Sequence, residues 1–152
     1  IIVTTLLFGM LLGVADRFSR RGAQHSGPVS LRDALLIGLA QAFALIPGTS
    51  RSGVTITAAL VLGYHPAAAT RFSFLLSVPV IGGAVVLMLS TMGSGESSLS
   101  GGAAFVAFAL SAIFAYATIK AFMYWVERVG LMPFVLYRLA LGGVLWVWII
   151  QG

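Results

Sequence analysis

The chain has 152 residues, of which 59% are hydrophobic and 9% are charged, and its mean hydropathy is +1.03. Soluble globular domains carry about 25% charged residues, so this composition excludes an ordinary soluble domain and indicates a surface that mostly faces lipid. The net charge of +5 fits the excess of Lys and Arg in cytoplasmic loops of membrane proteins, and we expect no nucleic-acid partner. The lack of cysteine excludes disulfides and thiol catalysis.

Apolar runs separated by polar segments predict a series of membrane helices. Residues 1–15 form the first apolar run, and an arginine-rich loop follows it over residues 16–32, where Ser30 is suited to cap the next helix. Residues 31–46 and 52–63 are apolar, but each is too short to cross a hydrocarbon core of about 30 Å. Three longer spans are expected at residues 67–92, 103–126 and 134–150, and residues 93–102 form a polar loop between the first two of them.

The distribution of positive charge indicates how these segments cross the membrane. If residues 31–63 crossed once, the arginine-rich loop and the turn that carries Arg71 would lie on opposite sides. If they enter and return, every basic segment lies in the cytoplasm and the loop with Glu96 lies outside, as the positive-inside rule requires. The sequence therefore predicts an all-α integral membrane protein with a single membrane domain over residues 1–152. It is a transmembrane helix bundle with one re-entrant helix pair at 31–63.

The tip of this pair carries the motif PGTSRSGVT, residues 47–55. Pro47 ends the incoming helix, Gly48 permits a sharp bend, and the outgoing helix is expected to start around Ser50. The free N–H groups and the positive dipole end of a helix start bind phosphate readily. Arg51 adds a guanidinium whose donors match phosphate oxygens. The motif therefore predicts an anion site near the bilayer midplane.

Two interpretations of these polar side chains remain open. In the first, Ser50 and Ser52 cap the helix, donate to phosphate or do both, and Thr55 shares a helix face with Arg51. In the second, Arg51 reaches toward the interface or pairs with a carboxylate, and the hydroxyls bond carbonyls one turn back. We favour the first, because a charge deep in a membrane is costly and is usually functional.

The motif and its flanks resemble the undecaprenyl-diphosphatase family, also known as bacitracin-resistance proteins. The resemblance rests on PGTSRSGVT, on GLAQAFALIPG before it, on RFSFLLSVP after it and on ADR at residues 15–17, and it covers approximately residues 10–90. It implies a hydrolase of the bacterial inner membrane that converts undecaprenyl diphosphate to undecaprenyl phosphate and inorganic phosphate. That reaction recycles the lipid carrier of cell-wall synthesis and confers bacitracin resistance.

The family architecture implied by the resemblance is a pair of inverted repeats, each with a re-entrant helix pair, that meet at a site open toward the periplasm. By the same resemblance this chain is similar to the C-terminal half. The implied catalytic residues are Ser50, Arg51 and Thr55, with Arg51 as the clamp on the pyrophosphate and the hydroxyls as groups that bind and orient phosphate. The residues expected to complete substrate binding are Gly48, Thr49, Ser52 and Gly53.

The family's second motif, with paired glutamates and a histidine, has no counterpart in this sequence. We interpret His25 and His65 as surface residues, and all four acidic residues as loop or membrane-edge residues: Asp16, Asp33, Glu96 and Glu127. We therefore predict no metal ligand in this chain. The divalent cation that the family uses, Mg²⁺ or Ca²⁺, is expected to be held mainly by the N-terminal half.

The expected partners are a polyprenyl diphosphate lipid and membrane lipids, and the oligomeric state is left open, a homodimer included. Residues Phe72, Phe74, Leu75 and Leu76 either line a groove for the prenyl tail or simply pack between helices, where small serines permit close approach. An alternative function is an inverted-repeat transporter or flippase for an anionic or lipid-phosphate substrate, because broken helices hold anions in such proteins as well.

Overall fold

The computed structural model describes residues 2–22, 25–91 and 101–151, and within these ranges it is helical, with one isolated bridge between His25 and Tyr64 and no strand. The chain therefore has the all-α fold that the sequence predicts. In chain order the elements are α1 (Ile2–Gly22), α2 (Leu31–Ala40), the 3-10 helix η1 (Gln41–Leu45), α3 (Arg51–Val61), α4 (Pro66–Thr91), α5 (Gly101–Arg128) and α6 (Met132–Gln151).

Within the described ranges, four helices are long and apolar enough to cross a membrane. Their apolar windows are Ile2–Ser19, Pro66–Met88, Gly102–Arg128 and Met132–Ile149. Helix α3 is apolar but shorter, with 11 residues, which at 1.5 Å per residue is too short to span a hydrocarbon core. Length and composition thus identify a multi-pass membrane protein.

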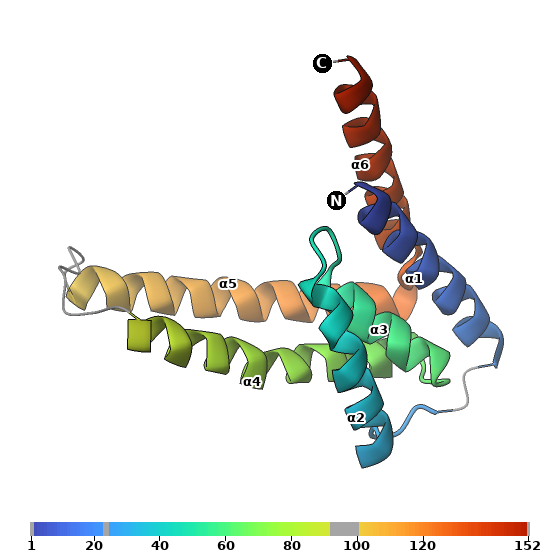
Figure 1. Cartoon of the computed structure of the whole chain (residues 1–152). Coiled ribbons are helices and arrows are strands. Elements are labelled where there is room, and N and C mark those ends of the chain that lie inside the picture. Colours follow the sequence, from blue (N-terminus) through green and yellow to red (C-terminus); the bar gives the residue numbers. More distant parts are fainter. Residues whose placement is uncertain (1, 23–24, 92–100, 152) are drawn as a thin grey trace.

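The helices form two pairs that are joined by α3 (Figure 1). Helices α1 and α6 lie side by side with both chain termini at the same end, and α4 and α5 form a long hairpin that extends away from them. Helix α3 contacts α1, α2 and α4, so the start of α3 is held between both pairs. This central position is what locates the motif in the fold.

Helices α1 and α6 approach each other closely because glycines lie in their contact. A β-carbon on Gly13 would come within 2.9 Å of a methyl group of Val135, and one on Gly142 within 2.6 Å of the Leu6 side chain. Small residues at such contacts are the usual means by which membrane helices pack. The described buried core continues from this contact through Leu12 into α2, α3 and α4.

The first helix differs from the sequence prediction. It continues to Gly22, beyond the expected end at residue 15, and Asp16 lies inside it with no exposed surface. The interpretation of Asp16 as a loop residue is therefore wrong, and its position relative to the membrane edge stays a prediction. Polar residues alone suggested a loop, whereas arginines are good helix formers and the helix end packs against the α3–α4 connection, where Ser19 donates to the Tyr64 carbonyl at 2.8 Å.

The segment from residue 31 onward follows the prediction more closely. Ser30 caps α2, as expected, and its hydroxyl accepts from the Asp33 amide. The incoming segment is not one continuous helix, because α2 ends at Ala40 and tightens into η1. Both histidines are exposed, as predicted. The predicted 93–102 loop with Glu96 lies almost wholly outside the described residues.

Tyr64 connects three segments next to this cap. Its hydroxyl donates to Asp33 Oδ2 at 2.7 Å and accepts from the Ser30 amide at 3.2 Å. Its ring lies 5.5 Å from that of His25. Only 3% of the Tyr64 surface is exposed, so the connection between α3 and α4 is fixed to the beginning of α2.

Candidate functional site

The motif forms a tight turn between η1 and α3. Gly48 has φ +91°, a left-handed conformation that glycine adopts without strain. The Thr49 amide donates to the Ile46 carbonyl at 3.1 Å. The Thr49 hydroxyl lies within hydrogen-bond distance of the carbonyls of Phe43 and Ile46. Thr49 thus closes the end of η1, while Gly48 reverses the chain.

Ser50 is the N-cap of α3. Its backbone is extended, and its Oγ accepts from the Gly53 amide at 3.2 Å, which satisfies one of the unpaired donors of a helix start. Its hydroxyl also lies 3.2 Å from that of Ser52. The prediction that the outgoing helix starts around Ser50 is confirmed, and the remaining first-turn N–H groups face outward from the helix end.

Arg51 is the first residue of α3 and is partly buried. In the described part of the chain its side chain forms neither a hydrogen bond nor an ion pair, so the alternative in which a carboxylate neutralises it gains no support there. A guanidinium beside a helix start adds positive charge to the positive end of the helix dipole. Such an arrangement is unfavourable by itself and is relieved by an anion.

A second arginine lies at the same helix end. Arg138 of α6 is half-buried, and its Nη1 atom lies 2.7 Å from the position that a β-carbon on Gly53 would occupy. Sequence reasoning missed it, although the signal was available: Arg138 is a charge only a few residues inside the apolar run 134–150, and a charge in such a run is usually functional, as for Arg51.

A cavity of about 230 Å³ adjoins this guanidinium. Arg138, Ser52 and Gly53 supply its polar edge, and its remaining walls are mostly apolar. Part of the wall is an aromatic series in edge-to-face contact, with ring centroids 5.6 Å apart for Phe74 and Phe122 and 5.1 Å apart for Phe122 and Phe134. The other lining residues are Leu12, Ile56, Thr118, Ile119 and Leu131. The cavity therefore joins cationic and hydroxyl groups to an apolar chamber.

Thr55 does not point into this cavity. It is 1% exposed, its hydroxyl lies 2.6 Å from that of Ser73 on α4, and it also lies 3.1 Å from the Arg51 carbonyl. The Thr55 hydroxyl thus bonds the carbonyl one turn back, as expected if the hydroxyls of the motif serve the helix and not a phosphate. Of the three implied catalytic residues, Ser50 and Arg51 are together at the helix start, whereas Thr55 anchors α3 to α4.

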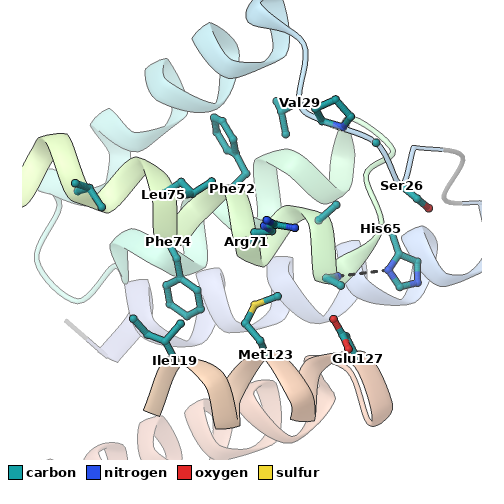
Figure 2. Close-up of a pocket in the computed structure, with 15 residues that line it drawn as sticks. Ser26, Val29, His65, Arg71, Phe72, Phe74, Leu75, Ile119, Met123 and Glu127 are labelled. Carbon is teal, nitrogen blue, oxygen red and sulfur yellow. Dashed lines mark hydrogen bonds between the residues drawn. The ribbon is translucent and has the colours of Figure 1, made fainter. Parts of the chain in front are cut away.

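A larger groove of about 1090 Å³ lies between α4, α5 and the segment before α2 (Figure 2). Of the four residues proposed to line a groove for a prenyl tail, Phe72, Phe74 and Leu75 do line it. Leu76 instead packs against the buried core. Figure 2 shows Arg71 directed into the groove and Glu127 at its lower edge. Phe74 and Ile119 line both cavities, so the two hollows share a wall.

The side chains at the start of α3 do not fit a divalent cation. They are guanidinium and hydroxyl groups with a helix N-terminus, whereas Mg²⁺ and Ca²⁺ select carboxylate and carbonyl oxygens. Among residues 2–22, 25–91 and 101–151, no group of three His, Cys, Asp or Glu side chains lies close enough to hold a metal ion. The chemistry of this donor set is that of an anion site.

Comparison with known proteins identifies a family. Residues 1–144 match the family model described as bacitracin resistance protein BacA. The match includes the tip turn, the start of α3 and Arg138, so every group assembled above lies within the part of the chain that the family model covers.

Curated relatives agree with this match. A protein of Chromohalobacter salexigens named undecaprenyl-diphosphatase is 52% identical over 151 residues, covering 98% of this chain and 56% of the relative. Proteins of the same name from Alteromonas mediterranea and Alcanivorax borkumensis are each 49% identical, over 93% and 98% of this chain and 53% and 56% of the relatives. This chain thus spans about half the length of the curated relatives that it matches.

Proposed function

Because this chain belongs to the BacA family of bacitracin resistance proteins, we propose that it forms the phosphate-binding part of an undecaprenyl-diphosphate phosphatase. The enzyme hydrolyses the terminal phosphoanhydride bond, with water as co-substrate, and releases undecaprenyl phosphate and inorganic phosphate. The product is the lipid carrier of cell-wall synthesis. The names of the relatives favour this hydrolase over the transporter alternative.

The observation that carries the proposal is the convergence of positive groups at the start of α3. Arg138 lies against Gly53, Arg51 begins the helix, and the Ser50 cap leaves further first-turn amides for a ligand. Arg51, as the first residue of α3, and Arg138, beside Gly53, both add positive charge near the positive end of the helix dipole, and this favours a bound anion. A diphosphate supplies several negative oxygens in a geometry that suits bidentate donors.

In this proposal the chain's own residues act mainly by electrostatics. Arg51 and Arg138 bind the diphosphate and stabilise the negative charge of the transferred phosphoryl group, and stabilisation of that charge is the main source of catalysis in phosphoryl transfer. Ser52 and the free amides of Gly48 and the first turn orient the terminal phosphate. Thr55 and Ser73 hold α3 in place. The group that activates the water is not assigned to any residue of this chain.

The prenyl chain of the substrate is proposed to enter the apolar chamber next to Arg138. Two observations support this: the rings of Phe74, Phe122 and Phe134 line the same cavity as the Arg138 guanidinium, and none of the described lining residues other than Arg138 is charged. Apolar burial of this kind contributes about 0.8 kcal/mol per methylene group.

We propose that residues outside this chain hold the divalent cation at the site, because the donor set at α3 suits phosphate oxygens and not a cation. Bound there, the cation would neutralise charge on the diphosphate. We further propose that residues 31–63 are re-entrant, that the site opens toward the periplasm, and that the protein resides in the inner membrane.

The proposal is tested by phosphate release from a C15 or C55 prenyl diphosphate by the full-length protein in detergent. Arg51→Ala and Arg138→Ala should each lower kcat/KM by at least about 100-fold, the effect expected for removing a donor to transition-state charge. Arg32→Ala, in the first turn of α2, is the matched control and should retain activity. Hydrolysis at the wild-type rate by Arg51→Ala, with folding intact, would refute the assignment.

A further inference from the structure

We infer that Thr4 and Thr5 of α1 are positioning residues that hold the tip turn in the orientation that the anion site needs. The inference rests on the proposed function and adds to it a contribution from α1, which neither the motif nor the family comparison points to. Both residues lie near the beginning of α1, 43 positions in sequence from the groups they contact.

Two consecutive hydroxyls of α1 reach two consecutive carbonyls of the turn. Thr4 Oγ1 donates to the Pro47 carbonyl at 2.8 Å, and Thr5 Oγ1 donates to the Gly48 carbonyl at 3.1 Å. These carbonyls lie between η1 and α3, outside any helical hydrogen-bond ladder. Among the described residues no backbone amide donates to either carbonyl, so the two hydroxyls satisfy groups that the turn itself leaves open.

The peptide between Gly48 and Thr49 is held at both ends. Its carbonyl accepts from Thr5, and its amide donates to the Ile46 carbonyl at 3.1 Å. Since Gly48 has φ +91°, it lacks the steric restriction that would otherwise fix this peptide. Thr5 therefore supplies the constraint that the glycine does not.

The orientation of these two carbonyls matters because the next residue is Ser50, the cap of α3. Engaged by α1, the negative ends of both peptide dipoles are neutralised by hydroxyl donors. Released, either peptide can rotate and turn its carbonyl oxygen toward a ligand at the helix start, where it would repel a phosphate. The threonines act through the backbone of the turn, and so they are positioning residues, not catalytic ones.

The test measures anion affinity separately from the amount of folded enzyme. In the full-length protein, inorganic pyrophosphate is used as a competitive inhibitor of C15 prenyl diphosphate hydrolysis, and its Ki is compared among variants. Thr5→Val and Thr4→Val, which keep the side-chain shape but remove the hydroxyl, should raise Ki about threefold to tenfold, the range for one lost hydrogen bond. Thr5→Ser and Thr4→Ser should restore it. Where a valine is not accommodated, the alanine variants replace it.

Ser77→Ala is the matched control, because the Ser77 hydroxyl donates to the Phe74 carbonyl within its own helix, at 2.6 Å, and this variant should keep the wild-type Ki. A purely structural role would lower the yield of active enzyme and leave Ki unchanged, which would overturn the inference. A wild-type enzyme that pyrophosphate does not inhibit, or an active Arg51→Ala variant, would instead contradict the proposed function. The two failures are therefore distinguishable.

Discussion

The guanidinium of Arg138 occupies the space beside Gly53 that any other residue at position 53 would need: Nη1 lies 2.7 Å from the position of a β-carbon there. The obstructing atom is the end of a long flexible side chain, so an added methyl group displaces Arg138 before it distorts the backbone. This contact couples the first turn of α3 to α6, and it allows the position of the guanidinium to be changed without removing its charge.

Gly53→Ala should therefore separate stability from activity. Alanine is more favourable than glycine inside a helix by about 1 kcal/mol, which offsets the close contact with Ser50 Cβ at 3.3 Å. The melting temperature should stay within a few degrees of wild type, while kcat/KM for prenyl diphosphate falls about tenfold or more because Arg138 is displaced. Gly38→Ala, where nothing lies within 4 Å, is the control. Equal activity in the two variants would show that the position of Arg138 is unimportant.

Substitutions at position 138 separate the positive charge of Arg138 from the geometry of its donors. Arg138→Lys keeps the charge but loses the planar fork of donors, and Arg138→Gln loses the charge as well. We expect kcat/KM to fall about tenfold for lysine and about 100-fold or more for glutamine. The measurement is steady-state hydrolysis in detergent at several salt concentrations. Equal losses for the two variants would indicate that the geometry of the donors, and not the charge, is what matters.

Ser50 has two roles that substitutions can separate. Ser50→Ala removes the cap and should destabilise the protein by about 1 kcal/mol. Ser50→Asp keeps a capping oxygen and a charge that the helix start favours, so stability should be retained, but its negative charge should repel the diphosphate and abolish hydrolysis. Thermal unfolding and phosphate release measured on the same preparations check both parts. Active Ser50→Asp enzyme would show that the helix start does not face the substrate.

These contrasts also show how much of the site could be predicted from the sequence. Local signals sufficed for the helix start at Ser50, the turn at Gly48 and the Ser30 cap, because each depends on residues within four positions of one another. The direction of the Thr55 hydroxyl depends on Ser73, which lies 18 positions away, and sequence spacing contains no such information. Arg138 was detectable as a charge in an apolar run, but its contact with Gly53 depends on how α6 packs.

The membrane helices were also predicted well from local sequence, because a long apolar run has few stable structures other than a membrane-spanning helix. The exception is Asp16. Its polarity and the arginines after it suggested a loop, yet α1 continues through it to Gly22, and the residue is buried. Burial of a carboxylate is decided by the elements that surround it. The hydropathy of the segment alone does not reveal them.

The Asp33 carboxyl should make the stability of the fold depend on pH. Hydrogen bonds from the Ser30 hydroxyl and then the Tyr64 hydroxyl lower the pKa of the Asp33 carboxyl below its ordinary value. A carboxyl with a lowered folded-state pKa stabilises the fold above its unfolded pKa of about 3.9, and this contribution is lost as the pH falls through the folded value. Thermal unfolding of the wild type should therefore lose stability at acid pH by a larger amount than Asp33→Asn does. Parallel pH profiles for the two proteins would contradict this.

Gly13 lies at the closest part of the contact between α1 and α6, and its replacement tests whether that contact is a structural requirement. A β-carbon there would come 2.9 Å from Val135 Cγ1, and valine is stiff about χ1, so the methyl group cannot move aside and the helices must separate. Overpacking of this kind costs about 1–3 kcal/mol, more than the ~1 kcal/mol that alanine gains as a helix former. Gly13→Ala should thus destabilise the protein.

Gly143→Ala on α6, with nothing within 4 Å, should be neutral or stabilising. Adding Val135→Ala to Gly13→Ala should recover part of the loss, as a double-mutant cycle in detergent would measure. If both glycine variants unfold at the same temperature, α1 and α6 accommodate an added methyl group at Gly13 and the close contact is not a structural requirement.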